Sequence, residues 1–317
     1  MKVSLTVLLS LSLLALPALA SDTTITAEDN NIGIRSGADF TYSNITGQYD
    51  NDGKQSENKN GSATSALINI NVEYNLANWV DGLSVGFDLP VIQNTANAAG
   101  DVKTALQAAE MATNWSGTGV GDVSAYGYYM YGVNDNVNVG GQVRFKAATG
   151  AGAEWNTTGE RTAVEIGSGH HNVQASVLFN ADVIDNMGID FDAGYIATME
   201  ADQTNVNETT KVNPGDIVYG NFGIAYTISN MITPEIGVHY YNATENTVAG
   251  ATAANTDSNA LGLSFNVGMK INNTWNANVG VGSNMISQGV NLPYGYTVMG
   301  KNANTGMGFN LGIAGAF

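Results

Sequence analysis

Apolar and polar residues alternate along most of the chain in short, regular segments. The clearest segment is the last one, residues 307–317. Every second residue from Met307 to Phe317 is apolar except Gly315, and the residues between them are small or polar. Because successive side chains of a β-strand point to opposite faces, this period of two predicts a strand with one apolar and one polar face.

Eleven further segments show the same alternation. They are residues 32–42, 66–75, 83–89, 123–131, 137–146, 173–180, 189–195, 218–226, 232–241, 261–270 and 275–281. A soluble sheet that ended on a flat apolar strand would aggregate at that edge, whereas single-chain bacterial barrels close an even number of strands. The sequence therefore predicts an all-β, transmembrane, antiparallel up-and-down β-barrel of the outer-membrane type, with about twelve strands.

The connections between these segments also alternate, in length. Short turns are expected near residues 78, 134–136, 184–186, 229–230 and 272–273, and long polar links at 47–61, 95–117, 148–168, 201–214, 242–257 and 287–302. Short periplasmic turns opposite long external loops are typical of outer-membrane barrels. In the second long link, residues 101–112 have apolar positions at helical spacing. They predict a short helix, either a lid or plug at the pore mouth or a helix resting on the rim.

The first twenty residues have the features of a secretory signal peptide. Lys2 precedes an apolar run that closes with Ala18-Leu19-Ala20, which is the charge, length and small-residue ending that signal peptidase substrates show. A transmembrane anchor is the alternative, but the run is short for a bilayer. We expect 1–20 to be removed and 21–317 to form a single barrel domain.

Composition supports an exported membrane protein. Charged residues make up 12% of the chain, against about 25% in soluble domains, and a barrel wall that faces lipid requires little charge. The absence of cysteine excludes disulfides and thiolate metal sites. A net charge of −17 argues against nucleic acid as a partner.

Several glycine-rich motifs resemble those of one known family. Gly119-Val120-Gly121-Asp122-Val123 is similar to a glycine-glycine-aspartate strand start, and Lys146-Ala147-Ala148-Thr149-Gly150 to a proline-threonine-glycine strand exit in which Ala148 replaces the proline. Gly167-Ser168-Gly169 and Asp192-Ala193-Gly194-Tyr195 resemble later motifs. The family is that of outer-membrane transporters named for the meta-cleavage pathway of phenol degradation. The resemblance implies transport of small organic, often aromatic, solutes.

The polar positions of the alternating strands should face the lumen, where charged side chains would tune ion or solute passage. The alternative is a closed network of salt bridges that fills a narrow barrel, because about twelve strands lie between a filled and an open interior. The lumen-lining candidates are Arg35, Asp39, Glu73, Asp88, Asp122, Arg144, Lys146, Asp190, Asp192, Glu235, His239 and Lys270.

Catalysis has little support in the sequence. Only His170, His171 and His239 could act as histidine bases. His239 and Ser264 share the inward parity on neighbouring strands, where they cannot easily reach a membrane lipid. We expect no catalytic residues, no cofactor and no metal site.

The predicted function is an outer-membrane channel for passive or facilitated uptake of small solutes. A structural or surface-interaction barrel with a closed lumen, and a lipid hydrolase, are the alternatives. We expect its partners to be outer-membrane lipid, the solute and the barrel assembly machinery, which would recognise Phe317 at the C-terminus.

Overall fold

The computed structural model describes residues 33–49, 55–57, 61–98, 103–104, 113–152, 154–155, 161–163, 166–204, 209–254, 256–286, 290–291, 297–298 and 304–316. Twelve long strands form the wall. They are β1 (Ile34–Tyr49), β3 (Gly61–Asn75), β4 (Leu83–Ala98), β6 (Ser124–Asn134), β7 (Val137–Lys146), β10 (Asn172–Ile184), β11 (Met187–Thr198), β14 (Ile217–Tyr226), β15 (Ile232–Ala243), β18 (Ser258–Lys270), β19 (Trp275–Ile286) and β22 (Asn304–Ala316).

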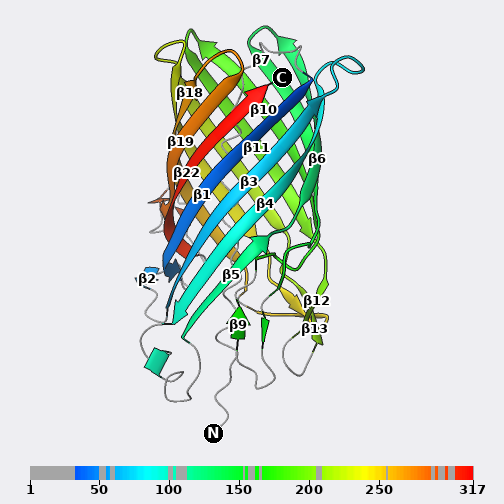
Figure 1. Ribbon diagram of the computed structural model, residues 1–317, viewed down its shortest axis with the longest axis vertical. Coiled ribbons are helices and arrows are strands. Elements are labelled where there is room, and N and C mark those ends of the chain that lie inside the picture. Colours follow the sequence, from blue (N-terminus) through cyan, green and yellow to red (C-terminus); the bar gives the residue numbers. More distant parts are fainter. Residues whose placement is uncertain are drawn as a thin grey trace.

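The twelve strands close into one antiparallel barrel (Figure 1). Each wall strand pairs with its neighbours in the chain, and β1 closes the ring by pairing with both β3 and β22. The register Arg35↔Ala316 places the start of β1 beside the end of β22. Closure leaves no wall strand with an unpaired edge, so every wall strand can satisfy its backbone groups inside a bilayer. The predicted fold and strand number are confirmed.

Polarity across the wall is the reverse of that in a soluble protein. Large apolar side chains of the alternating stripes lie on the outer surface, with Val177 62% and Ile236 61% exposed. Buried hydrophobic residues are few among the described residues, and most of them are alanines. The polar positions between the stripes, such as Asn278 and Asn310, are buried on the inner face. The apolar stripes therefore have lipid, and not a protein core, as their natural neighbour.

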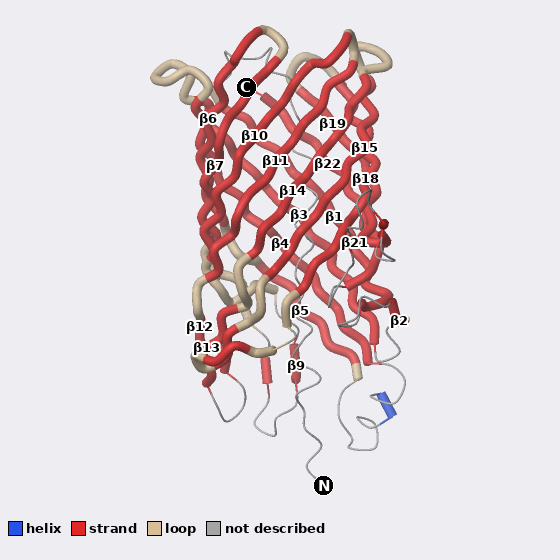
Figure 2. Tube along the Cα trace, turned by 180° about the vertical axis from the view of Figure 1, so that it is seen from behind, coloured by secondary structure: helices blue, strands red, loops and turns tan. Residues whose placement is uncertain are grey.

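Short turns and long loops lie at opposite ends of the barrel (Figures 1 and 2). Tyrosines are exposed on the outer surface near both ends of the wall, among them Tyr74 and Tyr131 at the short-turn end and Tyr42 and Tyr195 at the long-loop end. Such aromatic belts mark the two edges of the hydrocarbon layer. The first strand thus runs from the short-turn end towards the long loops.

At the long-loop end, the strands continue beyond the predicted segments. β3 begins at Gly61 and β4 ends at Ala98, where we predicted a strand from 66 and a loop from 95. Here polar and small residues replace the apolar stripe, and Thr64 Oγ1 lies 2.5 Å from Thr95 Oγ1 across the two strands. The alternation was lost because this part of the wall rises above the lipid, although the backbone ladder continues.

Two of the predicted polar links contain a second, small sheet. β12 (Ala201–Thr204), β13 (Thr209–Asn213), β16 (Thr247–Val248) and β17 (Ala251–Thr252) pair in that order. Further short strands in the remaining loops are β2 (Gln55–Glu57), β8 (Glu154–Trp155), β9 (Arg161–Ala163), β20 (Val290–Asn291) and β21 (Thr297–Val298), and β5 (Asn114–Val120) extends the wall beside β4. The polar links expected at 201–214 and 242–257 gave no sign of these strands, because the strands are too short and polar to show periodicity.

Three expectations fall on residues that the structure does not describe. The signal peptide at 1–20 and Phe317 lie outside the described residues, and of the predicted helix at 101–112 only Lys103 and Thr104 are described, both in helical conformation. In the described part of the chain we find no helix with the length and apolarity needed to cross a bilayer.

Candidate functional site: the barrel interior

Glycines and long polar side chains alternate across neighbouring strands on the inner face. Gly280 of β19 pairs with Asn310 on one side and Asn266 on the other, and a Cβ at Gly280 would overlap with the amide oxygens of both. Gly312 of β22 has the same relation to Asn278 and Asp39. The glycines provide the space in which each polar side chain lies flat against the wall.

On one side of the barrel, the carboxylate of Glu73 in β3 is contacted by three side-chain donors. Arg35 Nη1 lies 3.4 Å from its Oε1, Tyr128 donates its hydroxyl to the same oxygen at 2.8 Å, and Tyr126 donates to Oε2 at 3.4 Å. The donors come from β1 and β6, so the contacts cross the wall on both sides of Glu73. The structure thus brings two of the predicted lumen residues together as an ion pair.

A second cluster forms around Asp88 of β4. Arg144 of β7 is ion-paired with Asp88, and Ser124 donates its hydroxyl to Asp88 Oδ2 at 2.9 Å. The Arg144 guanidinium also lies 4.7 Å from the centroid of the Tyr126 ring, which stacks on Tyr128. Sequence analysis missed both tyrosines as lumen residues; the signal was available, because Tyr126 and Tyr128 share the parity opposite to the outward-facing Tyr129 and Tyr131.

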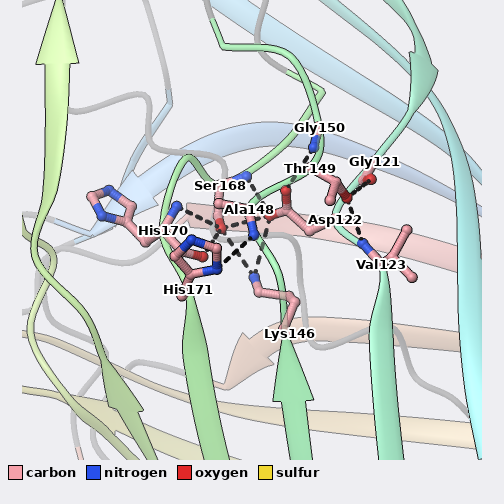
Figure 3. A network of polar contacts seen from close by, with 10 residues as sticks. All are labelled: Gly121, Asp122, Val123, Lys146, Ala148, Thr149, Gly150, Ser168, His170 and His171. Carbon is pink, nitrogen blue, oxygen red and sulfur yellow. Dashed lines mark hydrogen bonds and ion pairs between the residues drawn. The ribbon is translucent and has the colours of Figure 1, made fainter.

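The third cluster surrounds Asp122, in the break between β5 and β6 (Figure 3). Its carboxylate accepts hydrogen bonds from the backbone N–H of Gly150 at 3.0 Å and from both the N–H and the hydroxyl of Ser168 at 2.6 Å. Lys146 Nζ lies 3.6 Å from the same carboxylate and donates to Ser168 Oγ at 3.1 Å. Beside it, Thr149 Oγ1 accepts from Val123 N–H and donates to Gly121 O, both at 2.9 Å.

We call this cluster the Asp122 latch: Asp122, Lys146, Thr149, Gly150 and Ser168. It joins three segments that were singled out separately in the sequence, because the strand break at 119–123, the strand exit at 146–150 and the glycine-rich segment at 167–169 meet there. The latch therefore fixes both ends of the loop at 147–171 to the wall.

Two further residues of this loop, Ala148 and His170, lie beside the latch. Ala148, which stands where the resembling family has proline, donates its N–H to His171 Nδ1 at 3.2 Å, a bond that proline could not make. His170 lies in the same loop, outside the spanning strands, where burial lowers its pKa below the ordinary histidine value. It is therefore uncharged at neutral pH.

The latched loop reaches the inner face of the wall. Ile166 is buried, and its Cδ1 lies 2.6 Å from where a Cβ at Gly119 would stand, while Gly121 adjoins both Ile92 and the carbonyl oxygen of Ile166. By parity, Gly119, Gly121 and Ile92 face inward, opposite the outward-facing Val120 and Val91. Ile166 therefore narrows the interior at the long-loop end.

On the opposite side, a relay of polar side chains crosses four strands. Asp192 of β11 accepts from Asn221 Nδ2 at 3.3 Å and from the Tyr219 hydroxyl at 3.3 Å. Asn221 Oδ1 lies 3.1 Å from His239 Nδ1, and His239 Nε2 lies 2.7 Å from Ser264 Oγ. His239 and Ser264, which the sequence places on neighbouring strands with the same inward parity, thus form a direct hydrogen bond.

Asn221, His239 and Ser264 are spaced like the orienting group, base and nucleophile of a hydrolase. However, Ser264 is only 4% exposed, and β18 is hydrogen-bonded on both sides by β15 and β19. That ladder occupies the backbone N–H groups that an oxyanion would need. As placed, the relay can transmit a proton or fix a side chain, but a substrate has no visible approach to the serine.

The remaining predicted residues are Asp190, Glu235, Asp39 and Lys270. Asp190 of β11 and Glu235 of β15 adjoin the relay, Asp39 lies over Gly312, and Lys270 is exposed at the end of β18 beside a short turn. Among the residues that the structure describes, no three His, Asp or Glu side chains gather as metal ligands.

Comparisons with known proteins agree with this architecture. No protein-family model matches the chain, and no curated protein matches its sequence. Among solved structures, an outer membrane channel from Pseudomonas putida F1 superposes with a TM-score of 0.71 at 15% identity, over 92% of this chain and 100% of that one. The translocator domain of the autotransporter NalP from Neisseria meningitidis gives a TM-score of 0.48 at 10% identity, over 92% and 90%. The chain has the fold of a bacterial outer-membrane β-barrel.

Proposed function

We propose that the protein is exported, inserts into the bacterial outer membrane and admits small solutes through its lumen by passive or facilitated diffusion. The observation that carries this proposal is the distribution of polarity around a closed wall. Apolar side chains cover the outside, while charged groups, amides and glycines line the inside. Such a wall separates lipid from a polar interior, which is what a diffusion channel requires.

The route to the membrane is part of the same proposal. Residues 1–20 would direct export and be removed, and Phe317 would be read by the barrel assembly machinery. Membership of the phenol meta-pathway family is also proposed, supported by the glycine-rich motifs and by their convergence in the Asp122 latch. The P. putida channel with the same fold favours a channel over a closed structural barrel.

Reconstitution of the purified barrel into planar bilayers tests this function. We expect discrete steps of ionic current, because ions pass through a hydrated lumen, and swelling of proteoliposomes in isotonic sugars, amino acids or aromatic acids. Heat-denatured protein is the control. Folded protein that inserts but gives neither current steps nor swelling would contradict the proposal and favour the closed structural barrel.

A hydrolase is the second candidate, because the Ser264–His239 distance of 2.7 Å is that of an activated serine. The burial of Ser264 opposes it. We therefore expect the folded protein to release fatty acid from phospholipid, and p-nitrophenol from short-chain esters, no faster than the His239→Ala variant does. Hydrolysis by the wild-type chain that His239→Ala abolishes would establish the enzyme.

A further inference from the structure

At the long-loop end, one sector of the wall carries a neutral polar outer face. The strands β3, β4 and β5 lie side by side there (Figure 1). Side chains that continue the outward parity of the apolar stripes form what we call the polar face: Thr64, Gln93, Thr95, Asn97, Asn114, Ser116 and Thr118. Five of the seven are exposed, and Thr64 and Thr95 are half-buried against each other.

The lipid boundary crosses these three strands at one level. Their last exposed apolar row, paired across the strands, is Ile68, Val91 and Val120. The next row, two residues further along each strand, is Ala66, Gln93 and Thr118. Tyr42 of the aromatic belt is paired with Ala66 and so belongs to the same row. The outer face therefore changes from apolar to polar at the height of the belt.

The polar face rises well beyond that boundary. Asn97 lies six residues past Val91 on β4, which is about 20 Å along the strand and about 15 Å along the membrane normal at a strand tilt of about 40°. By contrast, β11 ends at Thr198, three residues past its belt residue Tyr195. This sector of the wall thus projects into the layer directly above the lipid.

The inner side of the same sheet is covered, so the polar face is a firm surface. Ala63 of β3 and both Asn94 and Ala96 of β4 are buried on that side. Hydrogen bonding across the strands holds the outward side chains about 4.8 Å apart between strands and about 6.7 Å apart along each strand. A partner would therefore meet an ordered array of hydrogen-bonding groups.

The chemistry of the polar face identifies the kind of partner. None of its seven positions is Lys, Arg, Asp or Glu, although about 25–35% of an ordinary solvated surface is charged. Hydroxyl and amide side chains both donate and accept hydrogen bonds, as the hydroxyl groups of a sugar do. A phosphate or carboxylate partner would instead require lysine or arginine, and an acyl chain would require apolar residues.

We propose that the polar face binds the core saccharide of lipopolysaccharide, the glycolipid of the outer leaflet, through hydrogen bonds to its sugar hydroxyls. Continuity with the lipid-facing wall selects this occupant, because the acyl chains beside Val91 and Val120 belong to molecules whose sugars lie directly above them. The contact rests on the proposed location in the outer membrane. It does not depend on solute passage, because the polar face lies outside the lumen.

Native mass spectrometry of the folded protein in detergent, titrated with lipopolysaccharide that has a complete core or with lipid A alone, measures the contact. We expect the complete-core form to bind about tenfold more tightly than lipid A. Gln93→Ala, Ser116→Ala and Thr118→Val combined should abolish this preference, at roughly two- to threefold for each lost hydrogen bond. The matched control, Asn136→Ala, Asn230→Ala and Asn273→Ala combined, removes three exposed polar side chains from short turns and should retain the preference.

Photo-cross-linking in cells locates the contact without the combined variants. With p-benzoylphenylalanine in place of Ser116, we expect an adduct that antibodies to lipopolysaccharide recognise, and none with the same group in place of Asn273. Equal affinity of the wild-type protein for complete-core lipopolysaccharide and lipid A would overturn the proposal, as would a Ser116 adduct that contains only another protein. Bilayer currents should be the same in the wild type and the combined Gln93, Ser116 and Thr118 variant, so loss of the saccharide contact and failure of the channel are separate results.

Discussion

Replacing Asp122 with alanine is expected to release the loop at 147–171 from the wall without unfolding the barrel. The substitution leaves the N–H groups of Gly150 and Ser168 without their acceptor and the Lys146 ammonium without its counterion. Removing one partner from a largely buried ion pair costs about 3–5 kcal/mol, so the ends of this long loop should separate from the wall. The strand ladder makes no use of the Asp122 side chain, so the wall should persist.

Hydrogen–deuterium exchange measures the release. Residues 147–152 and 166–171 should lose protection in Asp122→Ala, while β7 and β10 keep theirs, and trypsin should cleave after Arg161 faster than in the wild type. Single-channel conductance should rise, because Ile166 would no longer be held against the inner wall. Asp122→Asn retains one acceptor oxygen, so its exchange protection and conductance should lie between those of the wild type and of Asp122→Ala. Unchanged exchange in Asp122→Ala would show that the latch does not hold the loop.

The wall could be predicted from sequence because lipid imposes its polarity at every second residue. Where lipid ends, the same strands continue without that signal. Thr64 and Thr95 are paired across β3 and β4, yet both lie outside the segments that showed the alternation. The small sheet of β12, β13, β16 and β17 has no apolar face towards lipid at all, so nothing in its sequence distinguishes it from a polar link.

The sequence predicts which residues lie on the inner face, but it does not predict which of them contact one another. Parity alone assigns Asp88 and Arg144 to the lumen, but their contact joins residues 56 positions apart through β6. It depends on the register of each strand pair, which the sequence does not encode locally. Asp122 shows a different limit: its parity suggested a pore-lining charge, whereas its hydrogen-bond donors Gly150 and Ser168 come from the loop that returns over it, beside Lys146 at the end of β7.

Gly82→Ala is expected to cause the largest loss of barrel stability from the addition of one methyl group. Gly82 lies in the turn between β3 and β4 with φ of 79°, a left-handed conformation that costs alanine about 1–2 kcal/mol. A Cβ there would also overlap with the backbone carbonyl oxygen of Met130, which cannot rotate away because Met130 N–H donates to Gly82 O at 2.9 Å. Overpacking of this kind adds about 1–3 kcal/mol.

Two matched variants separate these causes. Gly250 has the same φ of 79° with nothing within 4 Å of its Cβ position, so Gly250→Ala carries the conformational cost alone. Gly220, with equally open space and no left-handed φ, should tolerate alanine almost without loss. Urea unfolding in lipid vesicles, followed by heat-modifiable gel mobility, should rank the variants Gly220→Ala, Gly250→Ala and Gly82→Ala in order of increasing loss. Equal losses of stability for Gly250→Ala and Gly82→Ala would mean that the β3–β4 turn and Met130 are not in contact. The barrel would then tolerate a displacement at this turn.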